Sequence, residues 1–458
     1  MNFTALAFVL GFPIVLAVHW LCPPRGRWLV LLTASLGFYA LGSPQAVGIL
    51  TVITLGTYGA ALGIGRSRTV AGKDLWCAGG VLLCLGCLGW FKYAGFLGQT
   101  LAALLGREVP MWNILLPAGI SFYTFQTLGY LLDVRRGTVP PERHLGHYAL
   151  FVSFFPQLVA GPIERTGDLI PQLKQDQRTP DPQGAVLLLR GFAKKLLLAD
   201  AMAPFVDRIY AAPGQGTGPE MLLATLLFAG QIYFDFSGYS DIAVGAAALL
   251  GVRLNRNFDH PYRAASIREF WRRWHVSLTR WFTDYLYIPL GGSRCGLVRH
   301  CVNLLVVFLA SGLWHGAAWH FVLWGALHGA FLAAEVCCRK WFPKKALPRP
   351  AAHGLTLVLV CFAWVFFRAD SVSAGGKLLA QLPTGWSLST LADCGQAVGL
   401  LPAAQMALGG LCLKLLPERL TGDPREATAL FWLTVAVFAA WMAGLTANTA
   451  SAFLYFQF

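Results

Sequence analysis

The sequence predicts an all-α polytopic membrane protein. The chain has 458 residues, of which 56% are hydrophobic and only 13% are charged, whereas a typical soluble domain carries about 25% charged residues. Apolar runs long enough to cross the hydrocarbon core, which takes about 20 residues in a helix, recur along the chain. We therefore expect about 10 to 12 transmembrane helices.

The net charge and the positions of the Cys residues further narrow the class of membrane protein and its expected partners. A formal net charge of +14 would point to nucleic acid in a soluble protein. Here the Lys and Arg residues lie between apolar runs, where they set membrane orientation and bind anionic groups. The lipid bilayer is therefore an expected partner and nucleic acid is not. Most of the eleven Cys residues lie inside apolar runs, where Cys behaves as a small buried hydrophobe.

The first 143 residues contain five candidate spans and carry the orientation signal. The spans are 3–21, 28–42, 46–65, 75–90 and 112–132. The first lacks a basic n-region and a small-residue cleavage site, so we expect it to remain as a span. Basic residues gather after the first, third and fifth spans. The positive-inside rule then places those ends in the cytosol and the N-terminus outside.

The segment that follows is less regular. The run 147–161 is short and ends in a bend with Pro, which favours a re-entrant or in-plane segment. The amphipathic stretch 184–203 favours the membrane interface. The long run 221–252 carries Asp235 and Asp241, with Gly238 between them as the point where the helix opens. We favour a kink whose carboxylates are satisfied by Arg or backbone N–H over direct catalysis, because unpaired acids at membrane depth are costly.

A basic and aromatic cluster precedes the last spans. It contains Arg268, Arg272, Arg273, Phe270, Trp271, Trp274 and Trp281. This composition is typical of an interfacial helix with aromatic anchors. The Arg residues fix topology, bind a phosphate-rich ligand, which guanidinium groups suit, or do both. The spans that follow are 302–318, 321–336, 354–367, 395–416 and 429–445, with a surface excursion at 371–393.

Several His residues lie in or beside these late spans. His315 lies between Gly312 and Gly316, which allow a neighbouring helix to approach closely. An imidazole there can take a proton from a hydroxyl at neutral pH, or it can be a polar packing residue. His320 and His328 lack metal-ligand spacing, so no metal site is expected. The plain interpretation of His275 is a surface residue at headgroup level.

Six motifs are similar to those of the membrane-bound O-acyltransferase (MBOAT) family. Within this family, the chain most resembles the bacterial alginate O-acetyltransferase-like branch. The motifs are LPAGISFYTFQTLGYLLDV (116–134), FFPQLVAGPIER (154–165), YFDFSGYSDIAVG (233–245), the segment 254–294 with RRWH, SGLWHGAAWHFVLWGALHG (311–329) and FAWVFFRAD (362–370). The resemblance implies one domain over 1–458, divided as 1–143, 144–345 and 346–458. It also implies about 11 transmembrane helices, plus re-entrant and interfacial helices, around a funnel.

The resemblance also implies an activity and a site. His315 matches the family's essential His and would act as general base, with His275 as the second His. An acetyl group would pass from a cytosolic donor, acetyl-CoA, towards an extracytoplasmic polysaccharide or a partner acetyltransferase. No cofactor is expected. The donor-binding candidates are Arg268, Arg272, Arg273 and Trp274, and the supporting candidates are Asp235, Asp241 and Trp314.

Two other functions remain open from the sequence. The first is D-alanyl transfer to teichoic acid from an acyl carrier protein, whose acidic surface the Arg cluster would also suit. The second is a transporter or channel, in which intramembrane polar residues line the pathway. In each case we expect a multi-pass protein of the bacterial cytoplasmic membrane.

Overall fold

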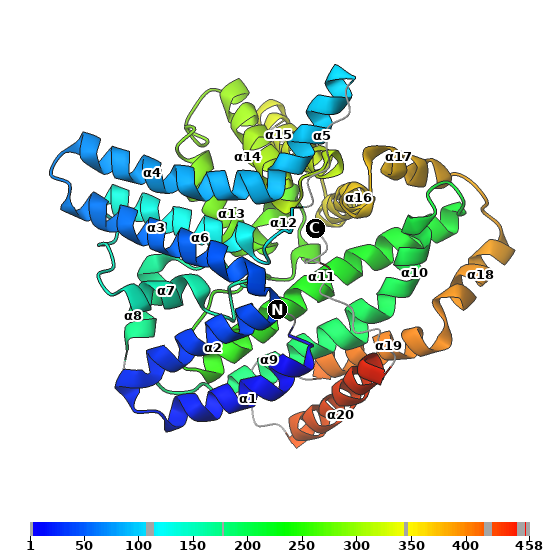
Figure 1. The fold of residues 1–458 in the computed structure, drawn as a ribbon. Coiled ribbons are helices and arrows are strands. Elements are labelled where there is room, and N and C mark those ends of the chain that lie inside the picture. Colours follow the sequence, from blue (N-terminus) through cyan, green and yellow to red (C-terminus); the bar gives the residue numbers. More distant parts are fainter. Residues whose placement is uncertain are drawn as a thin grey trace. The chain divides into compact units, whose positions relative to one another are not determined.

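The computed structural model describes residues 3–106, 114–175, 178–342, 347–415, 424–446 and 454 (Figure 1). Every regular element in these ranges is a helix. The chain divides into two compact units. The first comprises Met1–Leu188 and Ile242–Asn255, and the second comprises Leu189–Asp241 and Arg256–Phe458.

The first unit is built from the N-terminal helices. They are α1 (Leu6–Leu21), α2 (Arg27–Gly42), α3 (Val47–Arg66), α4 (Val70–Leu88), α5 (Ala94–Leu105), α6 (Ile120–Arg136), α7 (Leu145–Ser153) and α8 (Thr166–Lys174). A π-helical turn, Gly89–Tyr93, joins α4 to α5. Helix α6 is buried along almost its whole length and packs on α3 and α4.

A buried turn follows α7. Helix α7 has only nine residues, and residues 154–161 after it are buried without being helical. The buried Phe151 carbonyl near its end is satisfied, because Gln126 and Gln157 both donate to its oxygen at 2.7 and 2.9 Å. A short helix with a protein-covered turn fits the expected re-entrant or in-plane segment.

Two helices cross from one unit to the other along the chain. They are α9 (Gln183–Ala193) and α11 (Gly218–Leu249). Within the first unit they meet at Gly184 and Gly245, where a Cβ on either would lie 2.6 Å from the other's carbonyl oxygen. Only glycine permits backbones this close.

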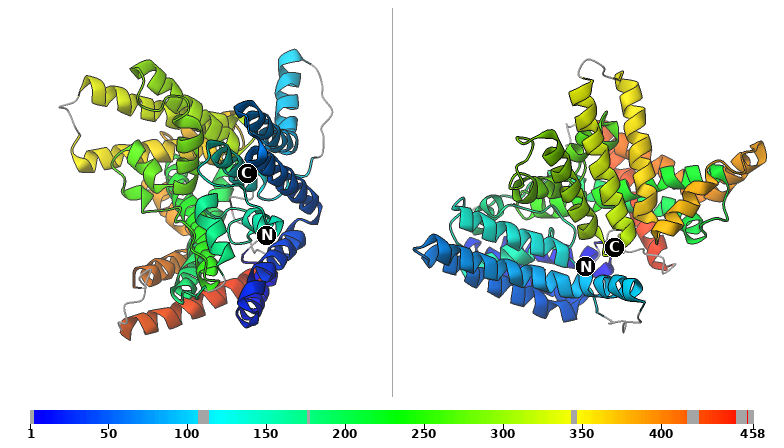
Figure 2. Two further views of the ribbon diagram at one scale, coloured as in Figure 1. Left: turned by 90° about the vertical axis from the view of Figure 1, so that its left-hand side faces the viewer. Right: turned by 90° about the horizontal axis from the view of Figure 1, so that it is seen from above.

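The second unit holds the remaining helices. They are a π-helical segment (Lys194–Ala199), α10 (Asp200–Ala211), α12 (Ile267–Arg273), α13 (Val276–Phe282), α14 (Leu297–His315), α15 (Trp319–Trp341), α16 (Arg349–Arg368), α17 (Val372–Gln381), α18 (Leu388–Val398), α19 (Leu400–Leu415) and α20 (Pro424–Thr446). Helices α14 and α15 lie side by side in Figures 1 and 2 and have the most extensive contact of any pair.

The fold class predicted from the sequence is confirmed. Seven helices in the described part of the chain are long and apolar enough to cross a membrane. They cover Pro44–Arg66, Val70–Leu105, Gly218–Leu249, Leu297–His315, Trp319–Trp341, Arg349–Arg368 and Glu426–Gly444. Shorter apolar helices at Leu6–Leu21 and Leu400–Leu411 accompany them, so length alone identifies fewer spans than the 10 to 12 we expected.

Three expected boundaries differ. The span 112–132 begins outside the described residues, and its helix α6 begins only at Ile120. Helix α11 runs without a break, so Gly238 does not open it. Gly238 instead lets another backbone approach, because a Cβ there would lie 2.8 Å from the Gly191 oxygen. The expected span 395–416 is divided at Gly399, whose φ of 83° ends α18.

Candidate functional site

The two histidines expected to be catalytic lie close together in the second unit. The ring centroids of His275 and His315 are 6.5 Å apart. Trp314 contacts both, with its centroid 5.8 Å from the His275 ring and 5.0 Å from the His315 ring. His275 is fully buried and His315 is 7% exposed. The sequence separates these residues by 40 positions, and the turn before α13 and the end of α14 bring them together.

Aromatic rings surround the pair. Phe236 lies 4.7 Å from His275, and Trp324 and Phe367 lie 5.0 and 5.4 Å from His315, measured between ring centroids. Burial lowers the pKa of His275 to about 3, because desolvation disfavours the charged imidazolium. His275 is therefore neutral at physiological pH. The plain interpretation of His275 as a headgroup-level surface residue is wrong.

The backbone of His275 is held in an uncommon conformation. Its φ of 45° and ψ of 53° place it in the left-handed region, which is unfavourable for residues with a Cβ. Asn257, in the loop before α12, holds the backbone at His275 in this conformation. Its carbonyl accepts from Val276 N at 3.0 Å, and its side-chain Oδ1 accepts from Ser277 N and Oγ at 3.2 and 2.7 Å. A strained backbone conformation of this kind persists only where contacts with the surrounding structure hold it in place.

His315 is the last residue of α14. Gly316 follows in an extended conformation and ends the helix, and a Cβ there would collide with the Phe321 ring. Gly312, one turn earlier, packs so closely on α15 that a Cβ would collide with the Phe321 carbonyl. The expected close helix approach around His315 is confirmed.

His320 and His328 are buried on one face of α15. The Nδ1 of His320 lies 3.1 Å from the Phe366 oxygen. The Nδ1 of His328 accepts from Trp271 Nε1 at 3.2 Å. Among the described residues, no group of three or more His, Cys, Asp or Glu side chains could hold a metal ion.

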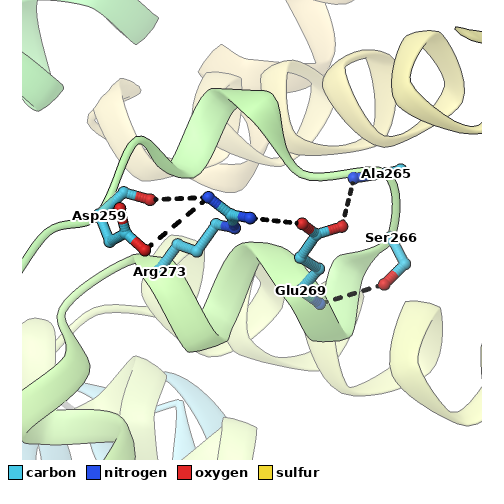
Figure 3. Close-up of polar contacts among 5 residues, drawn as sticks. All are labelled: Asp259, Ala265, Ser266, Glu269 and Arg273. Carbon is cyan, nitrogen blue, oxygen red and sulfur yellow. Dashed lines mark hydrogen bonds and ion pairs between the residues drawn. The ribbon is translucent and has the colours of Figure 1, made fainter.

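Arg273 is occupied by contacts within the protein. Its guanidinium donates to Glu269 at 2.8 Å and to the Asp259 carbonyl at 3.3 Å, and it lies 3.8 Å from the Asp259 carboxylate (Figure 3). Glu269 also accepts from Ala265 N at 2.8 Å. The Ala265 hydrogen bond and the Arg273 charge lower the pKa of Glu269. Arg273 therefore stabilises α12 and the loop before it, and less of its guanidinium remains for an external anion.

The rest of the Arg and Trp cluster divides into two groups. Arg272 is exposed and Arg268 is half-buried, with the Arg268 backbone N–H bound to Glu335. Phe270, Trp271 and Trp274 are 1%, 5% and 2% exposed. These three rings lie in the protein core, so the interpretation of all the aromatic residues as interfacial anchors is wrong. Trp274 stacks on Phe270, with centroids 5.5 Å apart.

The two acidic candidates belong to a separate charged cluster. Lys195 lies 2.9 Å from both Asp235 and Asp200, and Lys194 lies 2.5 Å from Asp241. Asp235 also accepts from the backbone N–H of Leu454 at 2.9 Å. Burial by itself lowers the pKa of Lys195, but the two carboxylates outweigh it and raise the pKa. The partners are thus Lys and backbone N–H, where we expected Arg or backbone N–H.

Sequence comparisons give the family. The model of the membrane-bound O-acyltransferase family matches residues 142–373. A protein of Azotobacter vinelandii, named probable alginate O-acetylase AlgI, is 37% identical over 100% of both chains. A Helicobacter pylori peptidoglycan O-acetyltransferase is 35% identical over 77% of this chain and 72% of its own. A Streptococcus thermophilus teichoic acid D-alanyltransferase is 29% identical over 50% and 58%.

The matched segment covers half of the chain and contains both buried histidines of the site. The cited relatives that match over 72% or more of both chains are named an O-acetylase and an O-acetyltransferase. This chain belongs to the membrane-bound O-acyltransferase family, in the branch of the AlgI proteins, and is a multi-pass membrane O-acyltransferase.

Proposed function

We propose that this protein transfers an acetyl group from acetyl-CoA in the cytosol to a hydroxyl group of an extracytoplasmic polysaccharide, directly or through a partner acetyltransferase. The names of the relatives that match along most of the chain support acetyl transfer to a polymer. The proposal places the protein in the bacterial cytoplasmic membrane with its N-terminus outside.

The observation that carries the proposal is the buried pair of imidazoles. In the proposed reaction, His315 takes the proton of the acceptor hydroxyl while the hydroxyl oxygen bonds to the thioester carbon. The C–S bond then breaks, and the thiolate takes the same proton from the imidazolium. His275 stays neutral because burial lowers its pKa. It therefore adds no second positive charge and serves as a polar, neutral wall of the site.

Two Arg residues of α12 would bind the donor. Arg272 and Arg268 suit the phosphates of CoA, because guanidinium groups form paired, charge-assisted hydrogen bonds with phosphate oxygens. Arg273 is committed to Glu269 and Asp259, so its role in the proposal is to hold α12. No cofactor takes part.

The test is His315→Ala in a deletion strain complemented with the gene. We expect the acetyl content of the exported polymer to fall at least ~100-fold, in line with the loss of a general base, while the protein stays in the membrane. His353→Ala, in α16, is the matched control and should leave acetylation unchanged. Wild-type acetylation in His315→Ala at equal protein levels would refute the proposal.

A second candidate is acyl transfer from a carrier protein. The teichoic acid D-alanyltransferase relative favours it, although it matches only half of this chain. Proteoliposomes given either radiolabelled acetyl-CoA or an aminoacylated carrier protein would separate the two donors. Turnover with the carrier protein alone would replace acetyl-CoA in the proposal.

A further inference from the structure

Two buried N–H groups on α15, which packs on the helix that carries His315, are not used by the mechanism above. Trp324 and His328 lie four residues apart on one face of α15, and both are fully buried. Trp324 lies between the two histidines, with its centroid 5.0 Å from the His315 ring and 5.0 Å from the His328 ring. These side chains therefore extend the site along α15.

The hydrogen bond from Trp271 determines which nitrogen of His328 is a donor. An indole N–H can only donate, so the Nδ1 that accepts from Trp271 at 3.2 Å carries no proton. The rings around His328 are aromatic, including Phe270, Phe308 and Trp364. Because Nδ1 accepts a hydrogen bond, the imidazole is the neutral form. A neutral His328 then carries its proton on Nε2 and is a donor there.

Neither donor has an acceptor in the part of the chain that the structure describes. Trp324 Nε1 and His328 Nε2 are both completely buried and make no hydrogen bond to a described residue. A buried N–H without an acceptor is destabilising, and in native structures such a group calls for an explanation, of which an accepting ligand is one. Two of them lie on adjacent turns of one helix, and the first has its ring against His315. This arrangement favours a shared acceptor.

We propose that Trp324 Nε1–H and His328 Nε2–H donate hydrogen bonds to the carbonyl oxygen of the acyl group during transfer. This inference rests on the proposed role of His315 as general base. As the acceptor oxygen bonds to the acyl carbon, the carbonyl oxygen becomes negatively charged. Fixed donors in a dry, aromatic site stabilise that charge much more than water does.

The location fits this role. The acceptor hydroxyl must lie about 3 Å from the His315 nitrogen to give up its proton, and the carbonyl oxygen is two bonds from the hydroxyl oxygen in the tetrahedral intermediate. Of the two proposed donors, Trp324 is the one whose ring directly adjoins the His315 ring, at 5.0 Å and nearly perpendicular. No proton moves from either donor, so His315 still carries the single proton that reaches the thiolate.

A pair of stacked Trp residues supplies a matched control. Trp364 stacks on Trp324 with centroids 5.9 Å apart and planes at 17°. Its buried Nε1 is satisfied, because it donates to Tyr262 at 3.2 Å. Trp→Phe removes the same atoms at both positions. Among the described residues, it breaks a hydrogen bond at Trp364 and none at Trp324.

Trp324→Phe should therefore lose mainly activity, and Trp364→Phe should lose mainly stability. With radiolabelled acetyl-CoA and the host polymer stripped of acetyl groups in proteoliposomes, Trp324→Phe should lower kcat about 100-fold with little change in KM. Its Tm in detergent should fall less than that of Trp364→Phe. Trp364→Phe should keep kcat within a few-fold. His328→Phe should also lose kcat, and His328→Gln should recover part of it, since an amide can both accept from Trp271 and donate.

Other outcomes would overturn the inference. Trp324→Phe with kcat within twofold of wild type would exclude donation to the acyl group. If kcat falls in proportion to Tm in both Trp variants, Trp324 is a packing residue. If His315→Ala stays active in the same assay, the proposed function fails first; if His315→Ala is inactive and Trp324→Phe is not, only this inference fails.

Discussion

Two buried polar clusters in the second unit are built in different ways. The first joins Lys195 on the π-helical segment to Asp235 on α11, and each charge has a partner of opposite sign. In the second, His275 and His315 are enclosed by aromatic rings, and His275 is kept neutral. A paired buried charge is fixed by its partner and favours a structural role. Next to that neutral ring, His315 is the imidazole that accepts a proton in the proposed reaction, which favours a chemical role for this cluster.

Breaking the charged cluster should give the largest loss of stability. Lys195 is 2% exposed, and Lys195→Ala leaves Asp235 buried without that cation. The free energy of unfolding should fall by about 3–5 kcal/mol, the range for removing one member of a buried pair. Chemical unfolding in detergent, followed by Trp fluorescence, measures it. The double variant Lys195→Met/Asp235→Leu should recover most of the loss, and failure to do so would assign the loss to packing.

Arg273 and Arg272 are adjacent, and we expect the first to have a structural role and the second to bind the donor. Arg273→Ala should lower the free energy of unfolding by about 1–2 kcal/mol, because it removes charge-assisted hydrogen bonds, with little change in the KM for acetyl-CoA. Arg272→Ala should do the reverse and raise that KM several-fold without loss of stability. Unfolding curves and acetyl-CoA titrations of the same two preparations test this. Identical effects of the two substitutions would contradict it.

The backbone at His275 gives the smallest expected effect. At a φ of 45°, glycine is unstrained, whereas residues with a Cβ lose about 1 kcal/mol or more. His275→Gly should therefore be about 1 kcal/mol more stable than His275→Ala, the opposite of the usual order in a helix. Thermal unfolding of the two variants measures the difference. A more stable Ala variant would show that Asn257 does not hold this conformation.

The apolar runs predicted the fold class because hydrocarbon length is a direct constraint on helix length. The exact ends of helices depended on tertiary contacts. Gly238 looked like a helix breaker in the sequence, yet α11 passes through it, because the glycine accommodates the Gly191 backbone. Gly399, which looked ordinary, ends a helix. A glycine's role depends on its neighbours in space, which a single sequence does not contain.

The site was predictable only in part for the same reason. His315 and His275 could be singled out by residue type and motif, but their proximity could not. The aromatic residues around Arg272 suggested an interface, whereas Phe270 and Trp274 stack in the core. Asn257 and Trp324 gave no signal at all. An Asn in a loop and a Trp in an apolar run are common, and only the hydrogen bonds and burial of these two distinguish them.

The π-helical segment at Lys194–Ala199 has a consequence for how the chain tolerates changes in length. It holds one residue more per turn than a regular helix, and it lets adjacent lysines meet carboxylates six positions apart on α11. Deleting a single residue there would restore ordinary helical winding and turn one ammonium group away from its carboxylate. In this stretch, a one-residue deletion would therefore break a buried ion pair even though both lysines are kept.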